Sequence, residues 1–250
     1  MPKTLPPKTP LRLVILALFL FAQRPVPVQA QTPVPPHSIQ WWEAGLAVGG
    51  VTALILVDQS VKDWAQDRRS QSTDDAADFF RHVGQPEVWA AVPAVIVGAG
   101  LITGSEHTTA VGARALGSAL LSGAVEVSLK IALGRRRPNE PNVGVWDFIP
   151  FSGNESMPSG HTTLAFAFAA SLADDLDPVW AKVGLYTLAA GTGWTRLNDN
   201  KHWFSDVVGG AIVGITSAKL VSGRWQVFGI QTPAIFVSDR GTTLSWHATF

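Results

Sequence analysis

Six apolar stretches that are rich in glycine and alanine lie along most of this chain, and each is long enough to form a helix. They constrain the fold strongly, because the breaks between them are polar and include helix-stopping residues such as Pro178 in the acidic turn that begins at Asp174. The charged stretch from Asp58 to Arg81 is taken as one of these breaks. We therefore predict a single all-α domain, a six-helix bundle. The expected helices cover residues 44–57, 88–103, 115–133, 162–173, 179–194 and 207–222.

The N-terminus has the pattern of an export signal. Basic residues precede the apolar run from Leu13 to Ala22, which is shorter than the about 20 residues that a membrane span needs. A proline-rich stretch then reaches Ala30, so residues 1–30 are interpreted as a signal peptide. Residues 31–40 are expected to form a stiff, Pro-rich leader, which leaves residues 41–225 for the helical domain.

The C-terminal residues 226–250 have strand rather than helix character. Apolar and β-branched residues at 234–237 and 242–250 flank the turn-forming sequence Ser238–Gly241. We therefore predict a small C-terminal β-hairpin, which should pack on the bundle or on another surface, because isolated hairpins are marginal in water.

Composition excludes several classes of function. The 19 basic and 19 acidic residues balance, so no global field attracts nucleic acid, and anion binding has to be local. The chain has no cysteine, which excludes disulfides, thiolate metal sites and cysteine nucleophiles.

One short sequence, Pro158-Ser159-Gly160-His161, comes directly before an apolar helix. Proline and serine suit a helix start, so a simple helix cap is one interpretation. The other is an anion site, because Gly160 allows close approach of the backbone and a helix N-terminus presents unpaired N–H groups.

Two further sequences supply partners for His161. Lys130 lies seven residues before Arg137, which precedes Pro138; downstream, Arg196 is followed by His202 and Asp206. His202 and Asp206 are four residues apart, so on a helix they would share a face and the carboxylate could orient the imidazole. Each motif alone is weak. Together they offer three cations, two histidines, a carboxylate and a glycine at a helix start, which is a site for a tetrahedral oxyanion.

These three motifs resemble those of the type 2 phosphatidic acid phosphatase family, which shares a helical fold with bacterial acid phosphatases and vanadium haloperoxidases. The family pattern is Lys-x6-Arg-Pro, Pro-Ser-Gly-His and Ser-Arg-x5-His-x3-Asp. Here the sequences are KIALGRRRP (130–138), PSGH (158–161) and TRLNDNKHWFSD (195–206). Thr195 replaces the usual serine but keeps its hydroxyl.

The resemblance implies a metal-independent phosphatase that acts on phosphomonoesters or lipid (pyro)phosphates without a cofactor. His202 would attack phosphorus and form a phosphohistidine, with Asp206 orienting its ring, and His161 would act first as general acid and then as base. The remaining residues would bind the phosphate. They are Lys130, Arg137, Ser159, Gly160 and Arg196.

Other candidate residues receive smaller roles. Arg135 and Arg136 could widen an electropositive mouth, but we expect them to flank the site in solvent. Trp146, Phe148 and Phe151 could grip an apolar leaving group, and packing of their loop onto the bundle is favoured. The four remaining histidines are interpreted as surface or satisfied side chains: His37, His82, His107 and His247.

Two other functions share these features: a vanadate-dependent haloperoxidase, and a non-enzymatic envelope protein with the same fold. Placement also has two solutions. An exported N-terminus followed by six spans would put Arg135–Arg137 in the cytoplasm, whereas family members of that kind have an extracytoplasmic site. With some segments short, we favour a soluble periplasmic bundle that can touch a membrane surface; the alternative is an integral inner-membrane protein.

Overall fold

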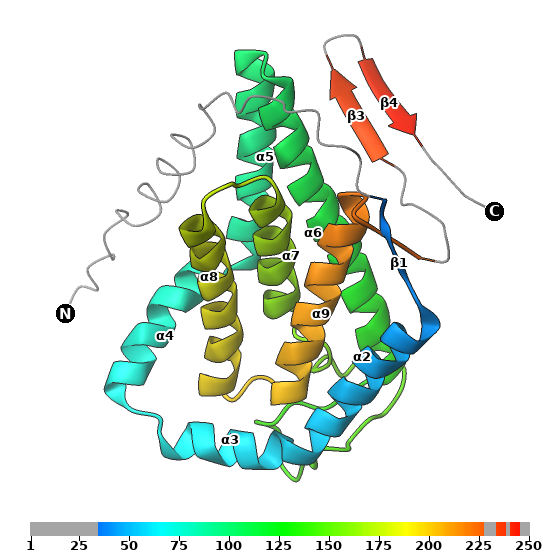
Figure 1. Ribbon diagram of the computed structural model, residues 1–250. Coiled ribbons are helices and arrows are strands. Elements are labelled where there is room, and N and C mark those ends of the chain that lie inside the picture. The colour runs from blue at the N-terminus through cyan, green and yellow to red at the C-terminus, as the bar shows by residue number, and fades with distance from the viewer. Residues whose placement is uncertain (1–34, 228–233, 239–240, 246–250) are drawn as a thin grey trace. The chain divides into compact units, whose positions relative to one another are not determined.

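The computed structural model describes residues 35–227, 234–238 and 241–245, and this part of the chain is mostly helical (Figure 1). The expected signal peptide, the first four residues of the leader (31–34) and His247 lie outside the described residues. The helices in chain order are α2 (Trp41–Leu54), the short 3-10 helix η1 (Ile55–Val57), α3 (Asp58–Asp67), α4 (Gln71–Val83), α5 (Pro86–Thr103), α6 (Glu106–Leu133), α7 (Gly160–Asp174), α8 (Val179–Asn198) and α9 (Phe204–Val221).

All six expected segments are helical, and two of them are much longer than the apolar runs suggested. The third begins at Glu106 rather than at residue 115, because the Ser105 hydroxyl accepts a hydrogen bond from the Thr108 N–H and starts α6 within a polar sequence. The first continues through η1 into α3.

The expectation that residues 58–81 form a polar break is wrong. They form α3 and most of α4, two amphipathic helices whose apolar faces are too narrow to appear as apolar runs. Ser70 starts α4 by accepting a hydrogen bond from the Thr73 N–H.

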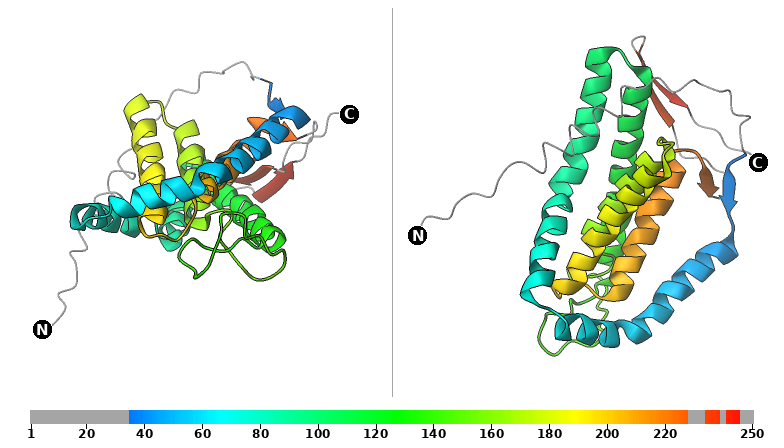
Figure 2. Two further views of the ribbon diagram at one scale, coloured as in Figure 1. Left: turned by 90° about the horizontal axis from the view of Figure 1, so that it is seen from below. Right: turned by 60° about the vertical axis from the view of Figure 1, so that its left-hand side comes forward.

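The helix α7 forms the centre of the domain and contacts α6, α8 and α9. Small residues make this packing close: its alanines are buried, and a Cβ added at Gly214 of α9 would lie 2.3 Å from the Thr163 carbonyl oxygen of α7. Beside them, α5 and α6 form an antiparallel pair (Figure 2).

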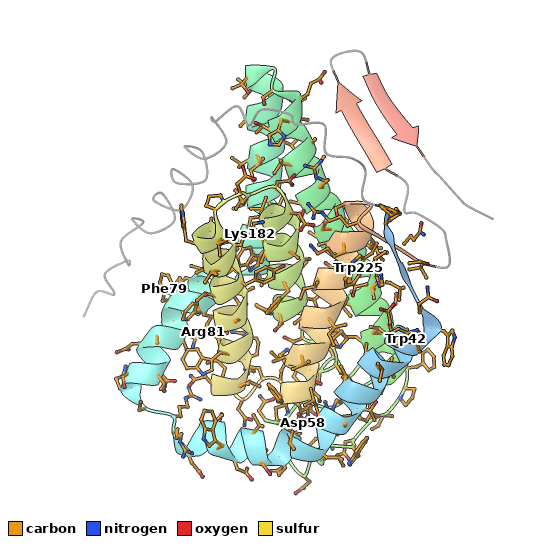
Figure 3. All side chains as sticks on the ribbon, viewed as in Figure 1. Trp42, Asp58, Phe79, Arg81, Lys182 and Trp225 are labelled. Atoms are coloured by element: carbon orange, nitrogen blue, oxygen red, sulfur yellow. The ribbon has the colours of Figure 1, made fainter. Side chains whose placement is uncertain are left out.

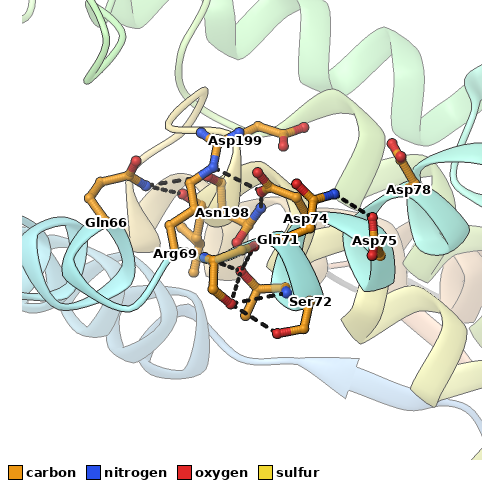
Figure 4. A network of polar contacts seen from close by, with 12 residues as sticks. Gln66, Arg69, Gln71, Ser72, Asp74, Asp75, Asp78, Asn198 and Asp199 are labelled. Atoms are coloured by element: carbon orange, nitrogen blue, oxygen red, sulfur yellow. Dashed lines mark hydrogen bonds and ion pairs between the residues drawn. The ribbon is translucent and has the colours of Figure 1, made fainter.

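The segment α3–α4 covers one end and one side of these central helices (Figure 1). The α3 helix crosses beneath the lower ends of α8 and α9, near the loop of residues 134–159, and α4 packs along α8 (Figures 1 and 2). Polar contacts join α4 to the end of α8, where the Arg81 guanidinium binds the Asp199 carboxylate at 2.9 Å and the Asn198 amide donates to Asp74 at 2.8 Å. Figure 4 shows the neighbouring part of this network.

Four short strands complete the described chain. The strand β1 (His37–Ile39), in the expected leader, pairs in parallel with β2 (Trp225–Val227) at the end of the helical domain. The strands β3 (Ala234–Ser238) and β4 (Gly241–Ser245) pair antiparallel in the region expected to form a hairpin.

Several described helices have the length and apolar character of membrane spans. They are Trp41–Asp67, Glu106–Leu133 and Phe204–Val221, and a bent pair within residues 71–103 makes a fourth if counted as one span. Large apolar side chains are exposed along them, including Leu56 at 72% and Ile102 at 88%. The length argument against spans therefore fails for the first and third predicted segments, and the apolar surface supports membrane association.

Candidate active site

The three predicted motifs meet at one end of the helical domain. Lys130 lies in the last turn of α6, the Pro158–His161 motif begins α7, Arg196 lies in the last turn of α8, and Asp206 lies in the first turn of α9. One hydrogen bond joins the second and third motifs, and close packing places the first motif beside the second. The Ser159 N–H donates to the Asp206 carbonyl at 3.0 Å, and a Cβ on Gly160 would lie 3.6 Å from the Lys130 Nζ.

The side chain of His202 is buried and its Nδ1 lies 2.8 Å from the backbone carbonyl of Ser156. A carbonyl oxygen can only accept, so Nδ1 carries the hydrogen and the neutral ring has its lone pair on Nε2. Burial lowers the pKa of His202, against the raising effect of the Asp206 carboxylate, which favours this neutral form. The ring therefore has a free nitrogen for attack on an electrophile.

The predicted shared helix face of His202 and Asp206 does not form. The helix α9 begins at Phe204, so His202 precedes it, and its Nδ1 is 3.6 Å from the Asp206 Oδ2, beyond hydrogen-bond length. Asp206 instead accepts hydrogen bonds from the Ser156 hydroxyl at 2.6 Å, the Trp203 N–H at 2.9 Å and the Arg135 guanidinium at 2.7 Å. Ser156 thus contacts both residues, with its carbonyl and its hydroxyl.

His161 lies in the first turn of α7 and is half-buried. Its pKa is lowered to about 4, most of all by burial and also by the charges of Arg196, His202, Lys130 and Arg137. These charged residues belong to the other two motifs, so His161 lies near the cations that the sequence analysis placed in the same site.

The start of α7 distinguishes the two interpretations of its motif. Ser159 occupies the N-cap position, yet its side chain makes no capping bond; its hydroxyl accepts a hydrogen bond from Thr162 at 2.9 Å. The first N–H bonded within the helix is that of Thr163, so those of Gly160 and His161 have no acceptor in α7. This leaves the helix start open to an anion.

The predicted cations have partners that hold them near the site. The Lys130 Nζ binds Glu126 Oε1 at 2.6 Å, and Arg196 binds Asp199 at 3.2 Å and the Thr195 hydroxyl at 3.0 Å. Burial lowers the pKa of Arg196, which lies outside the candidate spans. The loop after α6 is held at Arg137, whose N–H donates to the Glu140 carboxylate at 2.8 Å.

The expectation that Arg135 lies in solvent is wrong. Its side chain is fully buried, with ion pairs of 2.7 Å to both Asp58 and Asp206, and its guanidinium also lies over the rings of Phe148 and Trp203. Asp58 was not among the predicted site residues, because the whole charged stretch that contains it was expected to form a connection. Arg136 is partly exposed and binds Glu140.

Two remaining expectations concern metals and the loop. Within residues 35–227 and the two described strands beyond them, no group of three or more metal-binding side chains occurs. In the loop, the ring of Phe148 packs on Arg135, whereas the side chains of Trp146 and Phe151 are 52% and 79% exposed. Packing onto the bundle therefore accounts for Phe148 but not for the other two aromatic residues.

Comparison with known proteins adds a family to this geometry. Residues 112–228 match the family described as the PAP2 superfamily. The matched region is similar to the PAP2 superfamily and makes up slightly less than half of the chain. It contains α7, α8, α9, most of α6 and all the predicted site residues, whereas α2 to α5 precede it.

Curated proteins similar to this region are named as phosphatases. A lipid A 1-phosphatase of Porphyromonas gingivalis is 40% identical over 44% of this chain and 22% of its own length. A putative undecaprenyl-diphosphatase of Escherichia coli is 30% identical over 37% of this chain and 46% of its own length. The chain thus spans less than half the length of either relative.

The fold also has a solved counterpart. The crystal structure of a transmembrane PAP2-type phosphatidylglycerolphosphate phosphatase from Bacillus subtilis matches 73% of this chain and 95% of its own, with a TM-score of 0.54 and 20% sequence identity. This likeness concerns the fold alone.

Proposed function

We propose that this protein is a metal-independent phosphatase that hydrolyses lipid phosphates or diphosphates at the membrane. The observation that supports this most is the His202 ring, whose Nδ1 hydrogen is held by the Ser156 carbonyl so that Nε2 is free to attack. The names of the relatives support phosphate esters of lipids as the substrate class.

In the proposed reaction, the phosphoryl group lies between the start of α7 and His202. The N–H groups of Gly160 and His161, the Ser159 hydroxyl and the cationic side chains of Lys130, Arg137 and Arg196 bind its oxygens. Planar guanidinium groups suit this role because they donate two parallel hydrogen bonds.

The chemistry then proceeds in two steps. His202 Nε2 forms a bond to phosphorus while the bond to the leaving oxygen breaks, and a protonated His161 transfers its proton to that oxygen. Neutral His161 next removes a proton from water as the water attacks phosphorus, which releases inorganic phosphate and restores His202.

The first test is hydrolysis of para-nitrophenyl phosphate by cells that express the full chain, assayed with chelator in soluble periplasmic and detergent-extracted membrane fractions. Chelator-resistant activity in the membrane fraction is the expected result. The same activity in the soluble fraction would retain the chemistry but favour a soluble periplasmic protein with a cleaved signal. Absence of hydrolysis in both fractions would contradict the proposal.

A haloperoxidase with the same site is distinguished by its product. The relatives reported above are named as phosphatases, and we expect no bromide oxidation when the purified protein is given vanadate, bromide and peroxide. Vanadate should instead inhibit phosphate release, because it mimics the five-coordinate state of phosphorus at the same residues.

A further inference from the structure

Three polar side chains of α3, spaced four residues apart, contact the segments that carry the proposed active site. Asp58, Lys62 and Gln66 share one helix face by this spacing. The Lys62 Nζ donates to the Pro138 carbonyl at 3.0 Å and lies over the Trp203 ring, and the Gln66 amide donates to the Leu197 carbonyl at 2.9 Å. Figure 4 shows Gln66 beside the end of α8.

Asp58 makes the most buried of these contacts. It lies at the start of α3 (Figure 3) and is fully buried, with hydrogen bonds from the Ser205 N–H at 2.8 Å, the Ser205 hydroxyl at 2.6 Å and the Arg135 guanidinium at 2.7 Å. Every one of these partners donates, which suits an ionised carboxylate. Asp58 therefore joins α3 both to the start of α9 and to the loop after α6.

Arg135 connects Asp58 to Asp206, the carboxylate beside the proposed nucleophile His202. One of its terminal nitrogens binds Asp58, and the other binds Asp206 and the Ser205 hydroxyl. A single buried positive charge thus lies between two buried carboxylates. If Asp58 lost its charge, Arg135 would be attracted to Asp206 alone, and the Ser205 hydroxyl and N–H would lose their charged acceptor.

We propose that Asp58 is a positioning residue for the phosphatase reaction. It divides the hydrogen bonds of Arg135 between two carboxylates and holds the first turn of α9, and so sets the position of the Asp206 carboxylate 3.6 Å from His202. The inference rests on the proposed function. It concerns a residue outside the part of the chain that matches the PAP2 superfamily.

The test compares Asp58→Asn with Asp63→Asn, a matched change at an exposed position of the same helix, where Asp63 binds only Gln59 among its described side-chain contacts. With para-nitrophenyl phosphate, Asp58→Asn should lower kcat at least about tenfold, with a much smaller change in KM, because the phosphate-binding cations are untouched. Asp63→Asn should match the wild type in both constants.

A double variant tests whether the effect passes through Asp206. If it does, the kcat of Asp58→Asn combined with Asp206→Asn should be no lower than that of Asp206→Asn alone, because the carboxylate that Asp58 positions is already absent. Multiplied losses, or unchanged kcat in folded Asp58→Asn, would overturn the inference. Inactive wild-type protein would instead reject the proposed function itself.

Thermal unfolding of each purified variant in detergent checks that the variant is folded. The kinetic constants are then measured well below the unfolding transition. If Asp58→Asn does not fold, Ser205→Ala replaces it, because that change removes one hydrogen bond to Asp58 and one from Arg135 but keeps the Ser205 N–H bond. It should lower kcat by a smaller factor, again without an added loss in the Asp206→Asn background. An unchanged kcat in this variant would overturn the inference.

Discussion

The imidazole of His202 is held by the backbone of Ser156, with 2.8 Å between Nδ1 and the carbonyl oxygen, and not by a hydrogen bond to the Asp206 side chain. The tautomer of His202 is therefore determined by a backbone carbonyl, which is still present when the Ser156 side chain is substituted. Asp206 acts on the ring through charge and through the position of Ser156.

Substitution of the proposed nucleophile is the most direct prediction. His202→Ala should lower kcat at least about a thousandfold, since the phosphohistidine can no longer form. His82→Ala, at an exposed histidine of α4, provides the control and should retain full activity. Turnover near the wild-type rate in folded His202→Ala would refute the covalent mechanism.

Removal of the Asp206 charge should destabilise the fold. Asp206→Asn leaves the buried Arg135 with one carboxylate instead of two. The new side-chain amide also has hydrogens where the Asp206 carboxylate accepts hydrogen bonds from Ser156 and Trp203, so these donors can lose their acceptor. A buried donor that is left without an acceptor costs about 1–3 kcal/mol. Unfolding of the purified variant in detergent measures this loss, and a stability equal to that of the wild type would contradict the prediction.

The pH dependence should follow the protonation of His161. Its pKa is about 4 in the free protein because burial and the nearby cations disfavour the imidazolium. The general acid has to be protonated, so kcat/KM for an alkyl phosphate should fall as pH rises above this pKa. Bound phosphate adds negative charge and raises the pKa, which moves the fall in kcat to higher pH.

A matched variant isolates this proton transfer. His161→Asn should lower kcat/KM for an alkyl phosphate far more than kcat/KM for para-nitrophenyl phosphate, because nitrophenolate leaves without a proton. The constant kcat/KM reports the first step and excludes the later hydrolysis of the phosphohistidine, in which His161 acts as base for both substrates. Equal losses on the two substrates would argue against His161 as the general acid.

The loop residue Phe151 should affect lipid substrates selectively. It is exposed and adopts a left-handed backbone with φ of 61°, which asparagine tolerates better than phenylalanine. Its N–H binds the Ile131 carbonyl, next to Lys130. Phe151→Asn should raise KM for a long-chain lipid phosphate about fivefold, since partial burial of a phenyl ring is worth about 1 kcal/mol.

The control for this variant is the soluble substrate para-nitrophenyl phosphate, whose KM should stay unchanged. Thermal stability should be equal to the wild type or higher, because no burial is lost. An equal rise in KM for both substrates would place the effect at the phosphate site.

The sequence alone determined the helical class and the residues grouped around His161 and His202, because apolar segments and motif spacing are local properties of the chain. It did not reveal α3 and α4 as helices, since each buries only a narrow face and is otherwise charged.

Only the tertiary structure decided the partners within the site. Ser156 lies 46 positions from His202 and Asp58 lies 77 positions from Arg135, and no local pattern connects such residues. Packing brings them together in a buried region. There an unpaired charge or a lone donor is costly, so the partner of each group is set by what the fold places within hydrogen-bond distance.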